Sequence, residues 1–473
     1  MQNQATAERK ENKLGTMPVG KLLVNISLPI IISMLVMAFY NIIDSIYVSH
    51  YNSSALAALT YAMPIQNLII AFGTGTGVGV NSYVSRCLGE KKYNEARKAA
   101  ANGLFLTLCT YIVFALFGFF FVEAYIKSQT SSPETIKQGV DYLRICLIFS
   151  FGAFFEIMAE RLLQSTGKSL FTMYTQSIGA IINIVLDPIL IFGYISIPAL
   201  NIHIDFLDKG MGVSGAAIAT VVGQIVAAII ALLLNHFKNK DIRVKIKEFM
   251  PDWQIIKTIY IVGLPTIVMQ SIGSVMTYGM NKILAMNSEA AVNVFGAYFK
   301  LRSFVFMPVF GLNTGIVPII AYNYGAKKKE RIIKAMRLST ISAMTMMFIG
   351  VLVFVCFPAQ LLGFFKPDET MLRLGIPALR IISISFVFAG YCITIGSMFQ
   401  ALGNGVYSLI NSATRQLVFL LPLAFIIFKL FGVNYVWWSI VLAEVVSVAM
   451  TNYFLMKIIR QKIKPMNDKE VVA

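Results

Sequence analysis

Cysteine, histidine, tryptophan and charged side chains are all scarce in this sequence. Its 473 residues include 5 cysteines, 3 histidines and 3 tryptophans, and only 13% are charged. Because the cysteines stand singly, without a C-x-x-C spacing, neither a disulfide framework nor a structural zinc site is expected. The sequence also lacks the G-x-x-x-x-G-K-[ST] phosphate loop, so ATP is not expected as the direct energy source. We therefore predict that the protein uses no metal and no other cofactor.

Apolar residues take the place of the missing charges. They make up 57% of the chain and give it a mean hydropathy of +0.71, whereas a typical soluble domain is about half apolar and about a quarter charged. This composition excludes a soluble enzyme and a disordered chain. No H-E-x-x-H helix and no Ser/His dyad marks an intramembrane hydrolase, so the protein is not expected to be an enzyme.

Twelve stretches are long enough to cross a bilayer, which takes roughly 20 apolar residues per helix. The connecting segments are short, and we therefore predict an all-α polytopic membrane protein. The first 20 residues are polar and basic, which is not the pattern of a cleaved signal peptide. The predicted spans are 22–48, 55–85, 99–126, 143–165, 170–195, 213–236, 255–285, 292–324, 335–365, 378–402, 406–431 and 433–457.

Lysine and arginine are distributed unevenly between the loops. The net charge of +17 would suggest a nucleic-acid partner in a soluble protein, but here the N-terminus, the even-numbered loops and the C-terminal tail hold 27 basic residues, and the odd-numbered loops hold 6. Cytoplasmic loops carry the excess of Lys and Arg. We therefore expect both termini in the cytoplasm, a multi-pass protein in the lipid bilayer of the cell membrane, and no nucleic-acid partner.

The sequence repeats itself at an interval of 236 residues. Each half contains six spans, so both halves enter the bilayer in the same direction, which predicts two six-helix lobes related by a parallel pseudo-two-fold repeat. This organisation is typical of alternating-access transporters, although an old duplication in a channel or receptor would leave the same trace. The matching pairs are Leu28/Leu264, Pro29/Pro265, Gly79/Gly315, Gly89/Gly325, Leu143/Leu379, Arg144/Arg380, Gln164/Gln400 and Gly167/Gly403.

The spans and the repeat divide the chain into five segments. We expect the whole chain to work as a monomer, with a cavity between its two lobes. The segments are a cytoplasmic N-terminal tail at 1–21, an N-lobe at 22–237, a cytoplasmic inter-lobe loop at 238–254, a C-lobe at 255–457 and a cytoplasmic C-terminal tail at 458–473.

Acidic residues inside the predicted spans are few and unevenly placed. A charge near the bilayer centre costs at least about 2.5 kcal/mol and indicates a function by default. Four such acids lie in the N-lobe and one, Glu444, lies in the C-lobe, so the N-lobe is the better candidate for an ion-coupling site. The four are Asp44, Glu156, Glu160 and Asp187.

Asp187 is followed by a proline within the fifth span. Asn183 lies one turn earlier on the same helical face, where its amide can tune the carboxyl group. Pro188 removes a backbone donor and disfavours the helical conformation at Asp187, which leaves backbone groups open to a ligand or to water. We predict that Asp187 and Asn183 take part in cation coupling. The alternative is that Asp187 caps a helix that restarts at Pro188.

The first and fourth spans carry the other candidate residues. Tyr40, Asn41 and Asp44 share one polar face of the first span. We predict a coupling role for Asp44 and a substrate-binding role for Tyr40 and Asn41, unless Asp44 is merely solvated near the outer mouth.

Glu156, Glu160 and Gln164 step by four along the fourth span. Two like charges at this spacing repel, so at least one is expected to be protonated or neutralised by a cation. Arg161 points to another face and is a poor partner. The stripe is therefore predicted to bind a cationic substrate or a proton, whereas a protonated Glu156 in an interhelical hydrogen bond is an equally weighted alternative.

Three basic residues lie deep in the C-lobe without an assigned role. Lys300, Arg302 and Arg415 either pair with Glu444 or line a wet portal. They also keep open a second transporter hypothesis, a flippase or exporter of lipid-linked or polysaccharide precursors, because such a protein needs a cationic cavity for phosphate.

Several motifs resemble the multidrug and toxic compound extrusion (MATE) family over essentially the whole chain. The most similar branch is that of the MepA-like bacterial multidrug exporters, in which Glu160 and Asp187 match acids implicated in binding cationic drugs. The resemblance implies efflux of small organic cations driven by inward movement of H+ or Na+. The motifs are Asn41-x-x-Asp44, Asn183-x-x-x-Asp187-Pro188-x-x-x-Phe192-Gly193, Gly212-Val213-Ser214-Gly215-Ala216-Ala217-x-Ala219-Thr220 through Gln224, Gly89-Glu90-Lys91-Lys92 and Gly325-Ala326-Lys327-Lys328.

The sequence departs from the family in one respect. Some members place acids in the seventh and tenth helices for sodium coupling, but here 378–402 contains no acid and 255–285 contains none before its outer end. We therefore prefer Asp44 and Asp187 as the coupling pair and protons as the coupling ion, although Na+ could use the same groups. Protonation would weaken the hold on a cationic drug and favour its release outside.

Overall fold

The computed structural model describes residues 11–51, 53–197, 202–206, 208–243, 250–365 and 369–466, and most of them are helical. In the first half the elements are α1 (Lys13–Thr16), α2 (Val19–Tyr51), α3 (Ser53–Gly89), α4 (Tyr93–Phe120), α5 (Val122–Gln129), α6 (Pro133–Ile148), α7 (Phe151–Ser165), α8 (Ser169–Phe192), β1 (Tyr194–Ile197), β2 (Ile202–Asp205), α9 (Val213–Lys238) and η2 (Lys240–Ile242). In the second half they are α10 (Trp253–Ala285), α11 (Glu289–Gly325), α12 (Lys329–Cys356), α13 (Pro358–Gly363), α14 (Glu369–Ser383), α15 (Ser385–Ala401), α16 (Gly405–Ala413), η4 (Thr414–Leu420), α17 (Leu421–Phe431), α18 (Val433–Val436), α19 (Trp438–Ile458) and η5 (Ile459–Ile463). Parts of the predicted tails and of the predicted inter-lobe loop, at 1–10, 467–473 and 244–249, lie outside the described residues.

The helices of the described residues confirm an all-α polytopic membrane protein. Nine of them are individually long and apolar enough to cross a bilayer, and two bent pairs bring the number to eleven. The pairs α6/α7 and α14/α15 each bend by 44°, a feature that the predicted spans 143–165 and 378–402 did not include. At the second bend, the hydroxyls of Ser383 and Ser385 donate to the carbonyls of Arg380 and Ile382, at 2.9 and 2.7 Å, and compete with the backbone ladder.

The second predicted span, α3, is long enough to cross a bilayer but is less apolar than the other spans. Its 37 residues include the buried polar side chains of Thr76, Asn81 and Ser82. The Ser82 hydroxyl donates to the carbonyls of Gln400 and Ala401 in the other half, at 3.0 and 3.1 Å. These polar groups face protein and not lipid, which explains how α3 serves as the twelfth long helical segment despite its composition.

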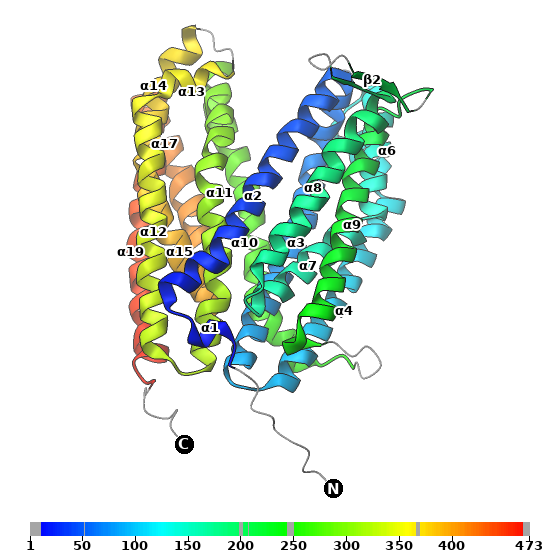
Figure 1. Ribbon diagram of the computed structural model, residues 1–473. Helices are drawn as coiled ribbons and strands as arrows, with labels where there is room; N and C mark the ends of the chain where they lie inside the picture. Colours follow the sequence, from blue (N-terminus) through cyan, green and yellow to red (C-terminus); the bar gives the residue numbers. More distant parts are fainter. Residues whose placement is uncertain are drawn as a thin grey trace.

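Figure 1 shows two groups of helices that converge at one end of the molecule and diverge toward the other. The described part of the chain begins at α1 and ends after α19 at the converging end, which we call the terminal face, and the β1–β2 hairpin lies at the diverging end. The larger apolar core joins residues of α1, α2, α3, α4 and α7 in the first half to most of the second half. A smaller core, from Val48 to Ala217, belongs to the first half alone. The halves therefore share a core only where they converge.

Glycines let the two halves approach each other closely. A Cβ added at Gly79 of α3 would lie 2.3 Å from the carbonyl oxygen of Ile259 in α10, and one at Gly315 of α11 would lie 3.0 Å from the Cα of Ser27 in α2. Gly89 faces the Tyr322 carbonyl in the same way, at 2.0 Å. A larger residue at any of these positions would push the helices apart, so the glycines are required for this packing.

The 236-residue repeat is confirmed in backbone geometry. Lys91 and Lys327 both have positive φ, 60° and 55°, and Gly167 and Gly403 have φ of 79° and 77°. The flanking turns use the same hydrogen bonds, for example Lys92 N to Cys87 O at 2.8 Å and its counterpart, from Lys328 N to Asn323 O, at 2.9 Å. The two halves thus form the same turns, because residues at equivalent positions of the repeat adopt the left-handed conformation.

A short antiparallel hairpin after α8 was not predicted from the sequence. Its strands β1 and β2 pair from Tyr194 opposite Asp205 to Ile197 opposite Ile202. Gly193, with φ 90°, ends α8 and turns the chain into β1. The hairpin occupies the place where the sequence suggested only a connecting loop.

Candidate functional site

The structure gathers most of the predicted N-lobe residues from three helices. Tyr40 on α2 lies close enough to interact electrostatically with Asp44, with Glu156 on α7 and with Asp187 on α8. Asp44 and Asp187 also interact with each other, and Glu156 interacts with Glu160. These acids therefore form one acidic cluster, although they are up to 143 positions apart in the sequence. The side chain of Asn41 lies outside the described residues.

Asp187 is the most deeply placed acid of the cluster. Its side chain is fully buried, and one carboxylate oxygen, Oδ1, has no hydrogen-bond partner among the described residues. The other, Oδ2, accepts from the amide of Asn183 at 3.2 Å when that amide is oriented so that its oxygen accepts from the backbone N–H of Thr220, at 3.1 Å. Asn183 thus links Asp187 to α9 and fixes the direction of one oxygen, which leaves the second available to a ligand or a proton.

The spacing of α8 and α9 makes this link possible. Gly179 and Gly223 bring the two backbones together, since a Cβ at Gly223 would lie 2.7 Å from the Gly179 carbonyl oxygen. Only at this distance does a side chain as short as Asn183 reach the Thr220 backbone.

The helix around Asp187 is continuous, although Pro188 was expected to disfavour the helical conformation there. α8 runs from Ser169 to Phe192 with Pro188 inside it, so Asp187 does not cap a restarted helix. Membrane helices tolerate such a proline because neighbouring helices enclose it. The missing backbone donor is still a feature of this helix, because Pro188 has no N–H to donate to the carbonyl one turn earlier.

Glu160 and Gln164 are both buried and both held by neighbouring side chains. Glu160 accepts from the Thr175 hydroxyl at 3.0 Å and from the Gln176 amide at 2.8 Å. Arg161 donates to the Gln164 side chain at 3.0 Å and interacts electrostatically with Glu160, so the expectation that it is a poor partner for the stripe is wrong. Glu156 is only partly buried and is the stripe residue that interacts with Tyr40.

Some residues of this region were not found by sequence reasoning. Gln66 on α3 donates to the Tyr142 hydroxyl at 2.9 Å, and Tyr142 interacts electrostatically with Asp44. Thr220 and Thr175 supply hydrogen bonds to the two acid-bearing helices. Thr220 did stand within the glycine-rich motif of the sixth span, but nothing in one sequence shows which of its residues faces α8.

The C-lobe arrangement answers the question left open for its basic residues. Arg415 pairs with Glu444 at 2.6 Å, and both side chains are largely buried. Arg302 stacks over the rings of Phe299 and Phe306, with its guanidinium carbon 5.1 and 4.4 Å from their centroids. Lys300 is exposed and lies near the Phe365 ring. The three cations therefore do not form one phosphate-sized cluster.

Metal-binding groups were sought across the described part of the chain. No cluster of three or more His, Cys, Asp or Glu side chains able to hold a metal ion occurs there. All five cysteines are free.

Comparison with known proteins places the chain among membrane transporters. The family model described as MatE matches it twice, at residues 29–189 and 265–426, which is once in each half. The chain is 26% identical to "Multidrug export protein MepA" of Staphylococcus haemolyticus (strain JCSC1435) over 438 residues, covering 92% of this chain and 93% of that protein. The protein of the same name from Staphylococcus aureus (strain MRSA252) is 26% identical over 435 residues, covering 90% of this chain and 91% of the other.

Solved structures agree in the whole fold. A structure described as an outward-facing conformation of a multidrug resistance MATE family transporter of the MOP superfamily superposes with a TM-score of 0.87, at 26% identity over 97% of this chain and 99% of the other. A MOP superfamily transporter from Pyrococcus furiosus Vc1 (DSM3638), described as having a reversed polarity of its binding pocket, gives 0.87 and 26% over 95% and 98% of the two chains.

Proposed function

Because the chain belongs to the MatE family of membrane transporters, we propose that it is a secondary antiporter that exports organic cations and drugs in exchange for an inward-moving cation. Protons are preferred to sodium as that cation. The transporter works by alternating access in the cell membrane, as a monomer with both termini in the cytoplasm. The relatives named as multidrug export proteins support the substrate class.

The observation that carries this proposal is the set of N-lobe acids that lack a direct ion pair. None of Asp44, Glu156, Glu160 and Asp187 forms an ion pair within 4.0 Å with a described Lys or Arg side chain. Asp44 and Asp187 each keep one buried oxygen that has no hydrogen-bond partner among the described residues. A carboxylate in low dielectric must acquire a proton or another cation. The proton and the cationic substrate compete for the same carboxylate oxygens, and this competition couples their movements.

The glycine contacts at the terminal face supply the conformational part of the proposal. The halves are interlocked there and diverge toward the β1–β2 hairpin (Figure 1). The similarity to a structure described as outward-facing supports assigning this arrangement to a state that is closed at the cytoplasmic side. A second state that is open at the terminal face would complete the cycle.

The flippase hypothesis has less support from the structure than from the sequence. It depended on three cations lining one cavity, whereas Lys300 is exposed and Arg415 is neutralised by Glu444. Binding the phosphates of a lipid-linked precursor would leave the acidic cluster without a role, so we retain cation export as the proposed function.

Dye export from inverted membrane vesicles tests the proposal. Wild-type protein should accumulate an ethidium-like dye under an imposed pH gradient, and much less under an imposed sodium gradient. Asp187→Asn should lose the pH-driven transport at least about tenfold, because the amide cannot exchange a proton. Asp208→Asn, at an exposed loop position, is the matched control and should transport normally. Full pH-driven transport by Asp187→Asn would contradict the coupling role, and a response to neither gradient would contradict the antiporter.

A further inference from the structure

A small cavity of about 50 Å³ lies inside the C-lobe, apart from the acidic cluster. It is enclosed by α10, α11, α15, η4 and α19. Aromatic side chains form much of its wall, and its charged lining residues are Arg302, Arg415 and Glu444. A water molecule takes up about 30 Å³, so the cavity has room for one small group and no room for a drug molecule.

The lining of this cavity carries one unmatched positive charge. Arg415 is neutralised by Glu444 at 2.6 Å, but Arg302 forms no ion pair within 4.0 Å with any described carboxylate. It lies over the aromatic rings of Phe299 and Phe306 and interacts electrostatically with Tyr298 and, beyond ion-pair distance, with Glu444. Two guanidinium groups and one carboxylate give the lining a net charge of +1, which makes a small anion a favourable partner.

A second observation also points to a missing ligand. Oε2 of Glu444, whose residue is 7% exposed, is a buried oxygen with no hydrogen-bond partner among the described residues. Because Oε2 only accepts, it needs a donor such as a water molecule carried in with the anion. Arg415 itself projects from the π-helical segment η4, and such segments frequently mark functional sites.

The repeat relates this cavity to the acidic cluster of the N-lobe. Arg302 stands 236 residues after Gln66, and Met276 stands 236 residues after Tyr40. Gln66 and Tyr40 both belong to the surroundings of Asp44. The corresponding regions of the two lobes therefore have opposite charge, acidic in the first and basic in the second.

We propose that the C-lobe cavity binds one small monovalent anionic group between Arg302 and Arg415. Halide from solution and a carboxylate group share the required charge and size. The proposal does not depend on the export of cations, since it concerns occupancy of the folded protein.

Thermal unfolding of the purified full-length protein tests the site. A ligand that binds only the folded state raises Tm in a saturable way. At matched ionic strength, chloride or acetate should raise Tm by on the order of a few degrees relative to a bulky sulfonate that the cavity cannot hold. Arg302→Gln should abolish the difference and Arg302→Lys should retain part of it. Arg380→Gln, which removes an exposed arginine at an outer helix, is the matched control and should behave as wild type.

The outcomes separate the sources of the anion. A shift with chloride assigns a halide site, and a shift with acetate alone assigns a site for a carboxylate group. If neither anion raises the wild-type Tm, or if Arg302→Gln responds as the wild type does, the proposal is overturned. If Arg302→Gln does not fold, the anion dependence of the wild type and of Arg302→Lys decides. Anomalous scattering from bromide-soaked wild-type crystals should then locate a halide beside Arg302, and an empty cavity without any acetate shift overturns the site.

An independent observation concerns the segment Glu11–Met17, which we call the N-terminal strap. It lies across the terminal face and bonds to both halves. Toward the first half, Asn12 donates to the Thr166 carbonyl and to Asp241, each at 3.2 Å. Leu14 is fully buried. The strap therefore belongs to the packed structure and is not a free tail.

The contacts of the strap with the second half involve three polar residues at the junction of α11 and α12. Arg331 donates to the carbonyls of Leu14 and Met17 at 3.1 and 2.7 Å, and Asn323 donates to the Leu14 carbonyl at 3.0 Å. Lys328 bonds to the Gly15 carbonyl at 3.0 Å and pairs with Glu11.

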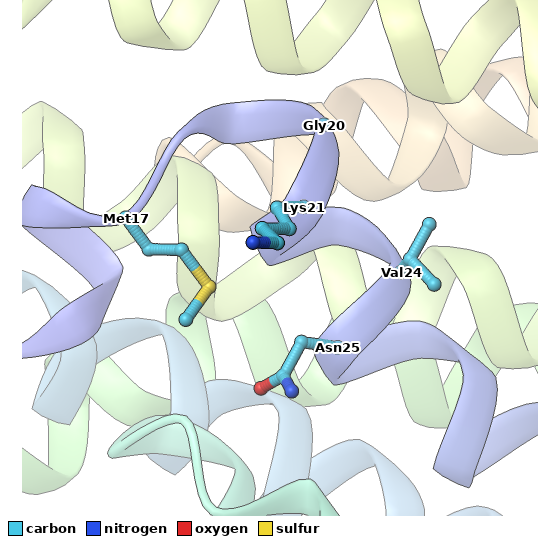
Figure 2. Close-up of a pocket in the computed structure, with 5 residues that line it drawn as sticks. All are labelled: Met17, Gly20, Lys21, Val24 and Asn25. Atoms are coloured by element: carbon cyan, nitrogen blue, oxygen red, sulfur yellow. The ribbon is translucent and has the colours of Figure 1, made fainter.

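Two features of the strap weaken its docking on the terminal face. Burial lowers the pKa of Lys13, and the charge of Lys168 lowers it further, so the charged form of Lys13 is disfavoured when the strap is docked. Figure 2 shows Met17, Lys21 and Asn25 around a hollow of about 500 Å³ beside the strap, at the start of α2. On that side the strap is backed by open space and not by the core.

We infer that the strap is a latch that holds the terminal face closed and must release on one side before the halves separate there. This inference rests on the proposed alternating access. Cys87, which is 1% exposed at the terminal end of α3, belongs to the apolar core that both halves share, so a rise in its labelling by maleimide is the expected readout of that release.

The test measures the maleimide labelling rate of Cys87 in purified protein whose other four cysteines are replaced by alanine. Arg331→Ala removes three hydrogen bonds to a charged group and should raise the rate at least about tenfold. Asn12→Ala should raise it as well, whereas Arg337→Ala, at an exposed position on α12, should not. An unchanged rate in both strap variants, or an equal rise in Arg337→Ala, overturns the latch. Transport is measured separately in vesicles, so failure of the latch and failure of the antiporter are distinguishable.

Discussion

Substituting Gly79 by alanine should disfavour the state in which the terminal face is closed. The added Cβ would lie 2.3 Å from the Ile259 carbonyl oxygen and 3.0 Å from its carbonyl carbon. Ordinary contacts of this kind begin at 3.4 Å, so α3 and α10 would have to separate by about 1 Å. The obstructing atoms are backbone, and no side-chain rotation relieves the overlap. Overpacking of this size costs about 1–3 kcal/mol, which corresponds to a 5- to 150-fold shift between two conformations.

The assay is the labelling rate of Cys87 in the background with no other cysteine. Gly79→Ala should accelerate labelling within that range and should slow dye export, because the transporter returns less readily to the closed state. Gly296→Ala is the matched control, since a Cβ at that position meets nothing within 4 Å. If Gly79→Ala were labelled as slowly as Gly296→Ala, the halves would not separate along the α3–α10 contact.

Three further changes have expected outcomes. Arg415→Met leaves Glu444 without its partner and should lower stability by about 3–5 kcal/mol in chemical denaturation, while adding Glu444→Leu should recover most of the loss; no recovery would mean that the pair is not the source of the effect. Gly403→Ala forces alanine into a φ of 77° and should lower stability by about 1–2 kcal/mol, unless the turn relaxes, in which case Tm will not move. Glu160→Gln keeps an oxygen that can accept from Thr175 and should change Tm little, but it should reduce dye export at least about tenfold because the charge is gone; normal export would remove Glu160 from the substrate site.

Sequence patterns were sufficient for the membrane class, the two related halves and the helices that carry the acids. Length and apolarity define a membrane helix locally, and a fixed repeat interval is visible in the letters themselves. The pairing of Asn183 with Asp187 also follows from helical spacing alone.

The rest depended on contacts between distant segments. Nothing local shows that Tyr40 lies near Glu156 or that Arg415 meets Glu444, because these pairs come from different helices. The expectation that Pro188 disfavours the helical conformation at Asp187 was wrong, because an isolated-helix argument ignores the neighbours that hold a proline-containing helix together. The roles assigned to Asp44, Asp187 and the Glu156–Gln164 stripe stay predictions until transport is measured.

The shared core at the terminal face has a consequence for synthesis. Leu22, Ile26 and Ile30 of α2 are buried in a core whose other members lie largely beyond residue 255. During translation these side chains can complete their packing only after more than 200 further residues have entered the membrane. Until then the first half holds its smaller core, from Val48 to Ala217, and only its own part of the shared core, so its terminal end stays incompletely covered. The first half thus finishes folding by packing against the second half. Truncation after the inter-half loop should leave a fragment that is stable at one end and prone to misassembly at the other.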